Sequence, residues 1–293
     1  NCFRRVPMSR LHASVVFMIG LIGLVTAGCF GGTAQVRVVH AQAPLQAPDS
    51  VDHTAWANVL QTYVDTTGAV DYARLTADAD SVLLPYLRTL ASTDPARLSR
   101  DARLAFWLNA YNAYTLKLIT DHYPVASIKD ITPGAGPSIP KVNSPFVLDV
   151  GAVADTVRTL DAIEHDIIRE RFDEPRIHFA LVCAAWSCPR LRREPYTGAA
   201  LDRQLDDQAR TFLHDTVKNR VPDGANRVAL SRIFKWFDDD FGGSRDAIQR
   251  FIAPYFDGTV ADRLSRADYT VDFLSYDWTL NASSTHAPST ATH

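Results

Sequence analysis

The sequence predicts an α+β fold: a helix-rich single domain with a small, mainly antiparallel sheet around a buried central helix. Helical periodicity dominates residues 51–281, which is the first indication. The second is the segment 104–116 (LAFWLNAYNAYTL), whose lack of any charged residue predicts a helix that is buried on all sides. The third is the order of the elements, because a few extended segments are scattered among the helices instead of alternating with them regularly.

The first half of the domain is expected to be mainly helical. Asp94 followed by Pro95 is a helix-start signal, because a capping residue precedes a proline at the first helical position. In chain order we expect a helix with one face formed by Trp56, Leu60, Tyr63 and Val64, a short extended or turn element at 68–72, a helix at 82–90, the central helix at 101–123 and a long loop at 124–145.

The second half mixes helices with short strands. Asp161 and Glu164 have the spacing of a capping box at a helix start. In chain order we expect a hairpin strand at 146–150, a helix at 161–172, a buried strand at 176–182, an amphipathic helix at 201–213, a short strand at 228–233, an aromatic and acidic segment at 234–241, a helix at 247–256 and an extended segment at 271–280.

Composition and charge describe a globular protein. Of the 293 residues, 46% are hydrophobic and 22% are charged, so the chain can bury a substantial core without a metal or several disulfides. The net charge is -3 and no long basic run occurs. A nucleic-acid partner, which would need a large phosphate-binding surface, is therefore not expected.

The N-terminus predicts export. Three arginines precede the apolar run 15–25, which is short for a membrane span. The sequence TAGC that ends at Cys29 resembles a lipobox, although Thr26 stands where a bulky aliphatic residue is usual. We expect a signal peptide at 1–29, lipidation at Cys29 and a cell-envelope or periplasmic protein whose lipid anchor makes the membrane its partner. The alternative is ordinary signal cleavage near Ala41.

The segments that flank the domain differ from it in composition. Residues 30–50 are small, polar and proline-containing, which is typical of a flexible tether. Residues 282–293 are rich in Ser, Thr and Ala, which is typical of a disordered tail. We therefore expect one folded domain over 51–281.

Several long strings occur together in this domain. They are LAFWLNAYNAYTLKLI, HYPVASIKDI, LDAIEHDIIR, PRIHFALVCAAWSCPRLR, LSRIFKWFDDDF and FLSYDWTLN. In content and order they resemble the domain of unknown function 547 family, from about residue 102 to 280, with residues 134–143 the least similar part. The resemblance implies no activity, because that family has no agreed function.

Two cysteines remain for the mature domain. Cys2 precedes the expected start and Cys29 is the lipidation site, which leaves Cys183 and Cys188. In an oxidising compartment they can form a disulfide that fastens a small loop. They can also include a reactive thiolate or be plain buried thiols. Their spacing is not that of a zinc ribbon, and we expect no metal and no cofactor.

Histidines and an acidic residue are candidate partners for a cysteine nucleophile. Cys183 is the candidate nucleophile, His165 the candidate base, and Glu164 or Asp161 the candidate orienting carboxylate. The alternative is that Glu164 caps its helix and His165 lies at the surface. His178 on the expected strand would point away from Cys183, because strand side chains alternate between faces. We therefore interpret His178 as a hydrogen-bonded core histidine or a substrate-binding residue.

Two amides and an acidic run complete the candidates. Asn109 and Asn112 share one face of the apolar helix, so each needs a buried hydrogen-bond partner, either within the protein or on a substrate. Residues 238–240 (DDD) favour a solvated acidic turn over a cation site.

Two functions follow from these candidates. The first is a thiol-dependent hydrolase or acyl transferase of the cell envelope. The second is a non-catalytic envelope binding or scaffold domain in which Cys183 and Cys188 form a structural disulfide.

Overall fold

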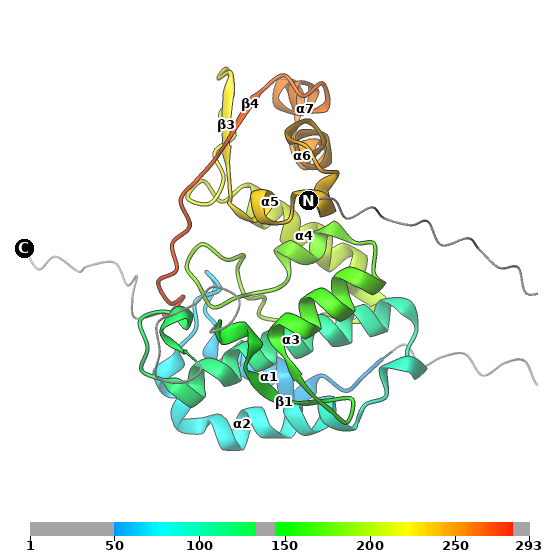
Figure 1. Ribbon diagram of the computed structural model, residues 1–293, viewed down its shortest axis with the longest axis vertical. Coiled ribbons are helices and arrows are strands. Elements are labelled where there is room, and N and C mark those ends of the chain that lie inside the picture. The colour runs from blue at the N-terminus through cyan, green and yellow to red at the C-terminus, as the bar shows by residue number, and fades with distance from the viewer. Residues whose placement is uncertain (1–49, 133–143, 284–293) are drawn as a thin grey trace, which may run out of the picture. The chain divides into compact units, whose positions relative to one another are not determined.

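A computed structural model describes residues 50–132 and 144–283 of the chain, and their fold is α+β as predicted. Most of the elements are helices, and the short strands among them form two separate two-stranded sheets (Figure 1). The predicted signal peptide, Cys29, almost all of the tether and most of the tail lie outside the described residues. No helix among the described residues combines the length and apolarity that crossing a lipid bilayer requires.

The first three helices form the larger hydrophobic core. They are α1 (Thr54–Tyr63), α2 (Tyr72–Ser92) and α3 (Arg100–His122). Ser99 caps α3 by accepting a hydrogen bond from the backbone N–H of Ala102. Every residue of α3 from Leu104 to Leu116 is buried, which confirms the predicted central helix. The apolar all-round surface of this helix is thus covered on every side by the rest of the domain.

An antiparallel hairpin lies against α3. Its strands are β1 (Asp149–Val153) and β2 (Thr156–Thr159), joined by a tight turn at Ala154 and Asp155, which both have positive φ. Gly151 of β1 approaches α3 so closely that an added Cβ would lie 2.7 Å from the ring of Tyr114. A hairpin is therefore present as predicted, but the expected strand bounds 146–150 are wrong: Pro145–Val147 form a 3-10 helix, the strand begins at Asp149, and the turn lies three residues beyond Gly151.

The predicted helix after the hairpin is present but is mainly a π-helix, labelled η4 (Ala162–Arg169). The capping-box prediction is wrong, because Asp161 is itself helical and its side chain caps nothing. Thr159 takes that role instead: its Oγ1 accepts a hydrogen bond from the N–H of Ala162 at 3.0 Å. π-Helical segments in proteins often mark functional sites.

The strand predicted at 176–182 is wrong. Residues Pro175–Phe179 form a 3-10 helix (η5), and the chain then runs irregularly towards Cys183. A buried apolar run fits either structure, and the N-terminal proline together with a capping Glu174 favours the helical turn. The backbone groups that a strand partner would have satisfied are instead bonded by the side chain of Asn112.

A second, smaller core lies in the C-terminal part of the chain. Its elements are α4 (Leu201–Leu213), β3 (Arg227–Leu230), α5 (Ile233–Trp236), η7 (Asp238–Phe241), α6 (Arg245–Ile252), η8 (Ala253–Tyr255), α7 (Gly258–Ser265) and β4 (Thr270–Phe273). The β3–β4 pair is parallel, and neither this pairing nor α7 was predicted. The remaining short helices are η1 (Pro95–Arg97), η2 (Ile128–Asp130), η3 (Pro145–Val147) and η6 (Gly198–Ala200).

The segment after β4 connects the two cores. It runs from the β3–β4 pair back to the N-terminal helices (Figure 1). It hydrogen-bonds the loop between the two cysteines, because the N–H groups of Trp186 and Ser187 donate to the carbonyls of Thr279 and Asp277 at 2.7 and 3.1 Å. Tyr276 on this segment packs against both cores.

Candidate functional site

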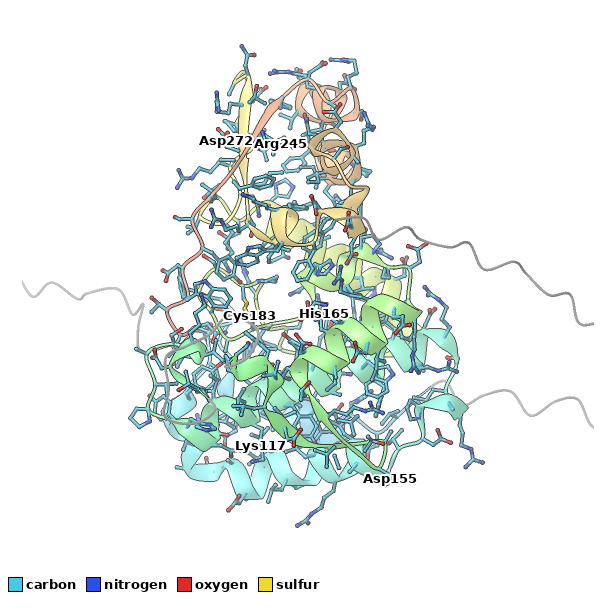
Figure 2. All side chains as sticks on the ribbon, in the orientation of Figure 1. Lys117, Asp155, His165, Cys183, Arg245 and Asp272 are labelled. Atoms are coloured by element: carbon cyan, nitrogen blue, oxygen red, sulfur yellow. A yellow bond between two sulfur atoms is a disulfide. The ribbon has the colours of Figure 1, made fainter. Side chains whose placement is uncertain are left out.

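A pocket with an empty volume of about 710 Å³, open mouth included, lies where these segments meet. Most of its wall is aromatic or apolar, and a few polar side chains point at it, as is usual for ligand sites. It is lined by Tyr111, Ser144, Phe146, Asp161, Glu164, His165, His178, Leu181, Cys183, Cys188, Ile233, Trp236, Phe237, Tyr276 and Trp278. Figure 2 shows the side chains of the domain and labels Cys183 and His165.

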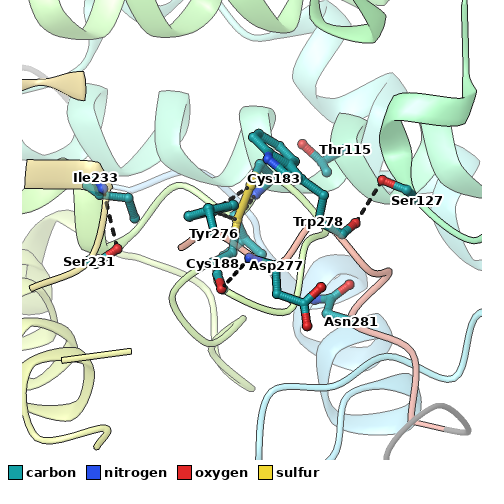
Figure 3. The surroundings of a disulfide bond; sticks show 12 residues. Thr115, Ser127, Cys183, Cys188, Ser231, Ile233, Tyr276, Asp277, Trp278 and Asn281 are labelled. Atoms are coloured by element: carbon teal, nitrogen blue, oxygen red, sulfur yellow. Dashed lines mark hydrogen bonds between the residues drawn. A yellow bond between two sulfur atoms is a disulfide. The ribbon is translucent and has the colours of Figure 1, made fainter. Parts of the chain in front are cut away.

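Cys183 and Cys188 are joined by a disulfide, with their sulfurs 2.11 Å and their Cα atoms 6.2 Å apart (Figure 3). Of the three states that the sequence left open, the structure therefore has the disulfide. Cys183 is partly exposed and Cys188 is buried, with 3% of its surface accessible. The hydroxyl of Tyr276 lies 3.2 Å from the sulfur of Cys183 and 3.1 Å from that of Cys188.

Three aromatic side chains form one wall of the pocket. The ring of Tyr276 lies 4.7 Å from each of the rings of Trp236 and Trp278, which are themselves 5.8 Å apart between centroids. Trp236 is 44% exposed, so much of this wall is open to a ligand. Burial, with a smaller contribution from the charge of Glu164, raises the pKa of Tyr276 well above its usual value, so its hydroxyl remains a hydrogen-bond donor.

The π-helix η4 brings two carboxylates to the pocket. Asp161 is exposed at its start, and Glu164 is half-buried one turn further on. Glu164 interacts with the buried hydroxyl of Tyr111 on α3. Burial, then the charge of Glu164 and its hydrogen bond, hold the pKa of Tyr111 well above its ordinary range, so this hydroxyl donates to the carboxylate.

A chain of polar contacts links the two histidines of the pocket. Nε2 of His178 lies 2.6 Å from Oδ2 of Asp240. Both oxygens of Asp240 accept from the guanidinium of Arg169, at 2.6 and 2.8 Å, and Arg169 in turn donates to Nδ1 of His165 at 2.8 Å. Hydrogen bonds from His178 and Arg169 outweigh partial burial and hold the pKa of Asp240 far below its usual range.

The imidazole of His178 is held firmly in place. Its side chain is 1% exposed and stacks on the ring of Phe237 with 4.0 Å between centroids. This geometry agrees with a hydrogen-bonded core histidine. Because η5 replaces the predicted strand, the argument that His178 must point away from Cys183 no longer applies, and both side chains line the same pocket.

The predicted group of Cys183, His165 and Glu164 meets at the pocket but is not connected by hydrogen bonds. Among the described residues, His165 has no hydrogen bond to Cys183. Its Nδ1 must accept from Arg169, because a guanidinium only donates, and its Nε2 lies 3.7 Å from a carboxylate oxygen of Asp161.

The two buried amides of α3 bond the backbone. Asn109 donates to the carbonyl of Tyr196 at 2.7 Å and accepts from its N–H at 3.0 Å. Asn112 donates to the carbonyl of Ala180 at 3.0 Å and accepts from the N–H of Val182 at 2.9 Å. This is the internal pairing that the sequence offered as one alternative, and neither amide is among the residues that line the pocket.

Sequence reasoning missed several residues of the site. The interpretation of residues 238–240 as a solvated turn is wrong for Asp240, which is bonded to both His178 and Arg169. The sequence did indicate that His178, as a buried histidine, needs a hydrogen-bond partner, but it did not indicate that Asp240 is this partner. The roles of Tyr111 and Tyr276 depend on contacts between segments far apart in the chain. Among the described residues, no group of three or more His, Cys, Asp or Glu side chains is arranged to hold a metal ion.

Comparison with known proteins finds a match to a family model over part of the chain. Residues 95–213 match the family model described as "Protein of unknown function, DUF547". This segment contains α3, the hairpin, η4 and the disulfide loop, and the match confirms the resemblance inferred from the sequence strings. The chain matches no curated protein and no solved structure.

Proposed function

From the premise that residues 95–213 match the family of proteins of unknown function DUF547, we propose that the domain binds a small organic cation in the pocket beside the Cys183–Cys188 disulfide. The observation that carries the proposal is that two carboxylates, Asp161 and Glu164, line the same pocket as an open aromatic wall. An ammonium or amidinium group gains both from nearby carboxylates and from the faces of Trp and Tyr rings.

Two cationic side chains lie beside residues that line this pocket, because Arg169 bonds His165 and the ammonium of Lys129 lies 3.8 Å from the ring centre of Trp278. Both oxygens of Asp240 accept hydrogen bonds from Arg169, so the positive charge of Arg169 is compensated. The guanidinium of Arg169 also lies 5.0 Å from the ring centre of Phe237. Asp161 and Glu164 place two carboxylates at the wall of the pocket. A planar cation is the ligand class that this combination of charge and aromatic surface fits best.

The test compares benzamidinium with its neutral isostere benzamide. Binding to the full chain is followed by calorimetry and by quenching of tryptophan fluorescence. We expect benzamidinium to bind at least about tenfold more tightly, which corresponds to about 1.4 kcal/mol. The variant Glu164→Gln should remove most of that difference.

Asp166→Asn is the matched control, because Asp166 is an exposed carboxylate on the same helix that does not line the pocket. It should leave the preference for the cation unchanged. Equal affinity for the two compounds, or a preference that survives Glu164→Gln, would contradict a cation site.

A specific observation supports a second candidate, a thiol-dependent hydrolase or acyl transferase. Asp240 and His178 form a carboxylate–imidazole pair, and His178 shares the pocket with Cys183. In a reduced state, the Cys183 thiolate would attack the carbonyl carbon of an amide or ester and expel the leaving group, which takes a proton from His178.

This candidate is tested with Cys188→Ser, which leaves Cys183 as a free thiol. The rate of alkylation by iodoacetamide is measured against pH. If His178 activates the thiol, the alkylation rate rises at a pH below the ordinary thiol pKa of about 8.5. Adding His178→Asn should then shift this rise back towards about pH 8.5. His214→Asn, which removes a histidine bonded to the carbonyl of Tyr255, is the control. Identical pH profiles in all variants would exclude activation by His178.

The chain is further proposed to be exported and lipid-anchored at Cys29. The lipobox-like sequence supports this proposal, and so does the disulfide, because such bonds persist mainly in oxidising compartments. In a bacterial host, Cys29→Ser should move the protein from the membrane to the soluble fraction, and Cys2→Ser should not. Retention of the Cys29→Ser variant in the membrane fraction would contradict the anchor.

A further inference from the structure

We propose that the Cys183–Cys188 disulfide is a thiol–disulfide exchange centre, in which Cys183 receives the incoming thiolate of a small thiol and Cys188 is the leaving group. This activity goes beyond ligand binding. It uses the access that the pocket provides, and it does not depend on the charge of the ligand.

The two cysteines differ in exposure, although both line the pocket. Cys183 is partly exposed on the pocket wall, whereas Cys188 is 3% exposed. Exchange requires attack along the line of the sulfur–sulfur bond, so access decides which sulfur an external thiolate reaches. The partly exposed Cys183 is therefore the sulfur that is attacked.

The sulfur of Cys188 has two hydrogen-bond donors in place, one of which, the hydroxyl of Tyr276, it shares with Cys183. The Sγ atom of Cys188 accepts a hydrogen bond from the backbone N–H of Cys183 at 3.0 Å and another from the hydroxyl of Tyr276 at 3.1 Å. A thiolate that leaves a disulfide carries a full negative charge, and hydrogen bonds to a charged acceptor are stronger than those to a neutral one. The site thus stabilises negative charge on Cys188 as it develops.

Tyr276 is positioned for this role by its surroundings (Figure 3). Its hydroxyl also lies 3.2 Å from the sulfur of Cys183, so it can donate to whichever sulfur carries the charge. The next residue is fixed to the disulfide loop, because the N–H of Asp277 donates to Oγ of Ser187 at 2.9 Å. Since burial raises the pKa of Tyr276, its hydroxyl keeps the proton that it donates.

The chemistry balances with a thiol as the only co-reactant. A thiolate R–S⁻ attacks the sulfur of Cys183, a bond forms between them, and the electron pair of the broken disulfide goes to the sulfur of Cys188. A second thiolate then attacks the R–S sulfur of this mixed disulfide, forms R–S–S–R and releases the thiolate of Cys183. Two thiols are thereby oxidised to R–S–S–R, and the cysteine pair is reduced by two electrons. Reaction with another disulfide reverses these steps and restores the pair.

The experiment maps the first mixed disulfide. The full chain is mixed with cysteamine or with 2-mercaptoethanol under native conditions, quenched with acid and digested with trypsin. Both cysteines fall in the peptide 177–190, and fragmentation between them locates the adduct. We expect the adduct on Cys183 with both reagents. An adduct mainly on Cys188, or a disulfide that reacts only after unfolding in denaturant, would overturn the proposal.

The role of Tyr276 is tested by the rate of mixed-disulfide formation. Tyr276→Phe should slow this step about tenfold, because one hydrogen bond to the leaving thiolate is lost. The control Tyr63→Phe removes a hydroxyl that donates to Asp78 on α2, and its rate should match the wild type within about twofold. An unchanged rate in folded Tyr276→Phe would remove the leaving-group assignment.

The two reagents separate this proposal from the cation site. Cysteamine carries a positive charge and 2-mercaptoethanol does not. A faster reaction with cysteamine that is lost in Glu164→Gln would support the cation site. Equal rates, with the adduct still on Cys183, would contradict the cation site and leave the exchange centre supported.

Discussion

Asp240 is the residue on which the charged contacts beside the pocket depend. Its carboxylate is the shared acceptor for His178 and for Arg169, two side chains that approach it from different elements. If this carboxylate is lost, a buried imidazole and a partly buried guanidinium lose their main partner. Leaving such groups unsatisfied costs more than the hydrogen bond itself contributes.

Asp240→Asn should therefore lower the free energy of unfolding by about 2–3 kcal/mol. The measurement is urea denaturation at neutral pH. Asp239→Asn is the matched control, since Asp239 is an exposed neighbour, and it should change stability by less than about 0.5 kcal/mol. Similar losses in the two variants would show that the contacts of Asp240 do not stabilise the fold.

The pH dependence of the same interaction has a definite sign. The pKa of Asp240 is lowered in the folded protein, so the unfolded chain takes up this proton at a higher pH than the folded one. Its stabilising contribution is present above the ordinary Asp pKa of about 3.9 and is lost as the pH falls below it. His53 titrates at higher pH and gives a separate test.

His53 is buried against α2 and α3. Its Nδ1 lies 2.7 Å from the hydroxyl of Tyr86, and its Nε2 lies 3.4 Å from the amide nitrogen of Asn109. Burial lowers its pKa from 6.5 to about 4, against a smaller opposite effect of Asp52. The unfolded chain therefore binds a proton between these values while the folded protein does not, and stability falls as the pH drops from 6.5 towards 4.

We expect the loss over this range to be on the order of 3 kcal/mol, from about 1.4 kcal/mol per pH unit. Urea denaturation at successive pH values measures it. In His53→Gln the slope between these pH values should become much shallower, whereas His122→Gln, at the end of α3, should keep it. A wild-type stability that is flat from pH 6.5 to 4.5 would show that His53 is protonated in the folded protein.

At the scale of elements, α3 organises the irregular segments around it. Asn112 bonds the carbonyl of Ala180 and the N–H of Val182, and so fixes the chain that leads into Cys183. Asn109 does the same for the backbone of Tyr196. These contacts replace the strand ladder that would otherwise satisfy buried backbone groups.

Asn112→Ala should lower the free energy of unfolding by about 2–4 kcal/mol, because it leaves two buried backbone groups without partners. It should also speed exchange of the amide hydrogen of Val182, which hydrogen-exchange mass spectrometry detects in the segment before Cys183. The exposed Asn226→Ala is the control and should cost less than about 1 kcal/mol. A loss in Asn112→Ala no larger than in the control would argue against this bracing role.

The long amphipathic or apolar segments could be predicted from the sequence, and the short irregular ones could not. α3 and its burial followed from thirteen uncharged residues in a row, because no other arrangement shields them. The segment 176–182 was assigned to a strand because its apolar run does not distinguish a strand from a short helix. The π-helical form of η4 has no periodic signal of its own.

The candidate site divides in the same way. Cys183, His165, Glu164 and His178 were identified as chemically notable and do line one pocket. Their partners were not identified, because Asp240 and Tyr276 come from segments 62 and 93 residues away from His178 and Cys183, respectively. Such pairings depend on how the two cores pack, which no local pattern encodes.

At the scale of the whole domain, the disulfide lies where the segment after β4 rejoins the first core. The loop that it closes is short, with a sequence separation of 5 residues. A loop of this size contributes about 2 kcal/mol in the chain-entropy description. The larger core and the hydrogen bonds to residues 277 and 279 hold the same region.

The double variant Cys183→Ala and Cys188→Ala should therefore stay folded, with its free energy of unfolding lowered by about 2 kcal/mol. Circular dichroism and urea denaturation measure this loss. Ser187→Ala, in the same loop, keeps the disulfide and serves as the control. Complete unfolding of the double variant would show that the disulfide is a folding requirement and would weaken the case for an exchange centre that is reduced in its working cycle.

The state of the two sulfurs in the native protein is the most direct test of the pocket. The protein is purified without reductant, denatured in the presence of iodoacetamide, and digested, and the mass of the peptide 177–190 is measured before and after reduction. We predict that neither Cys183 nor Cys188 is alkylated before reduction and that both are alkylated after it. Alkylation of both cysteines without reduction would contradict the disulfide wall of the pocket and the exchange chemistry proposed for it.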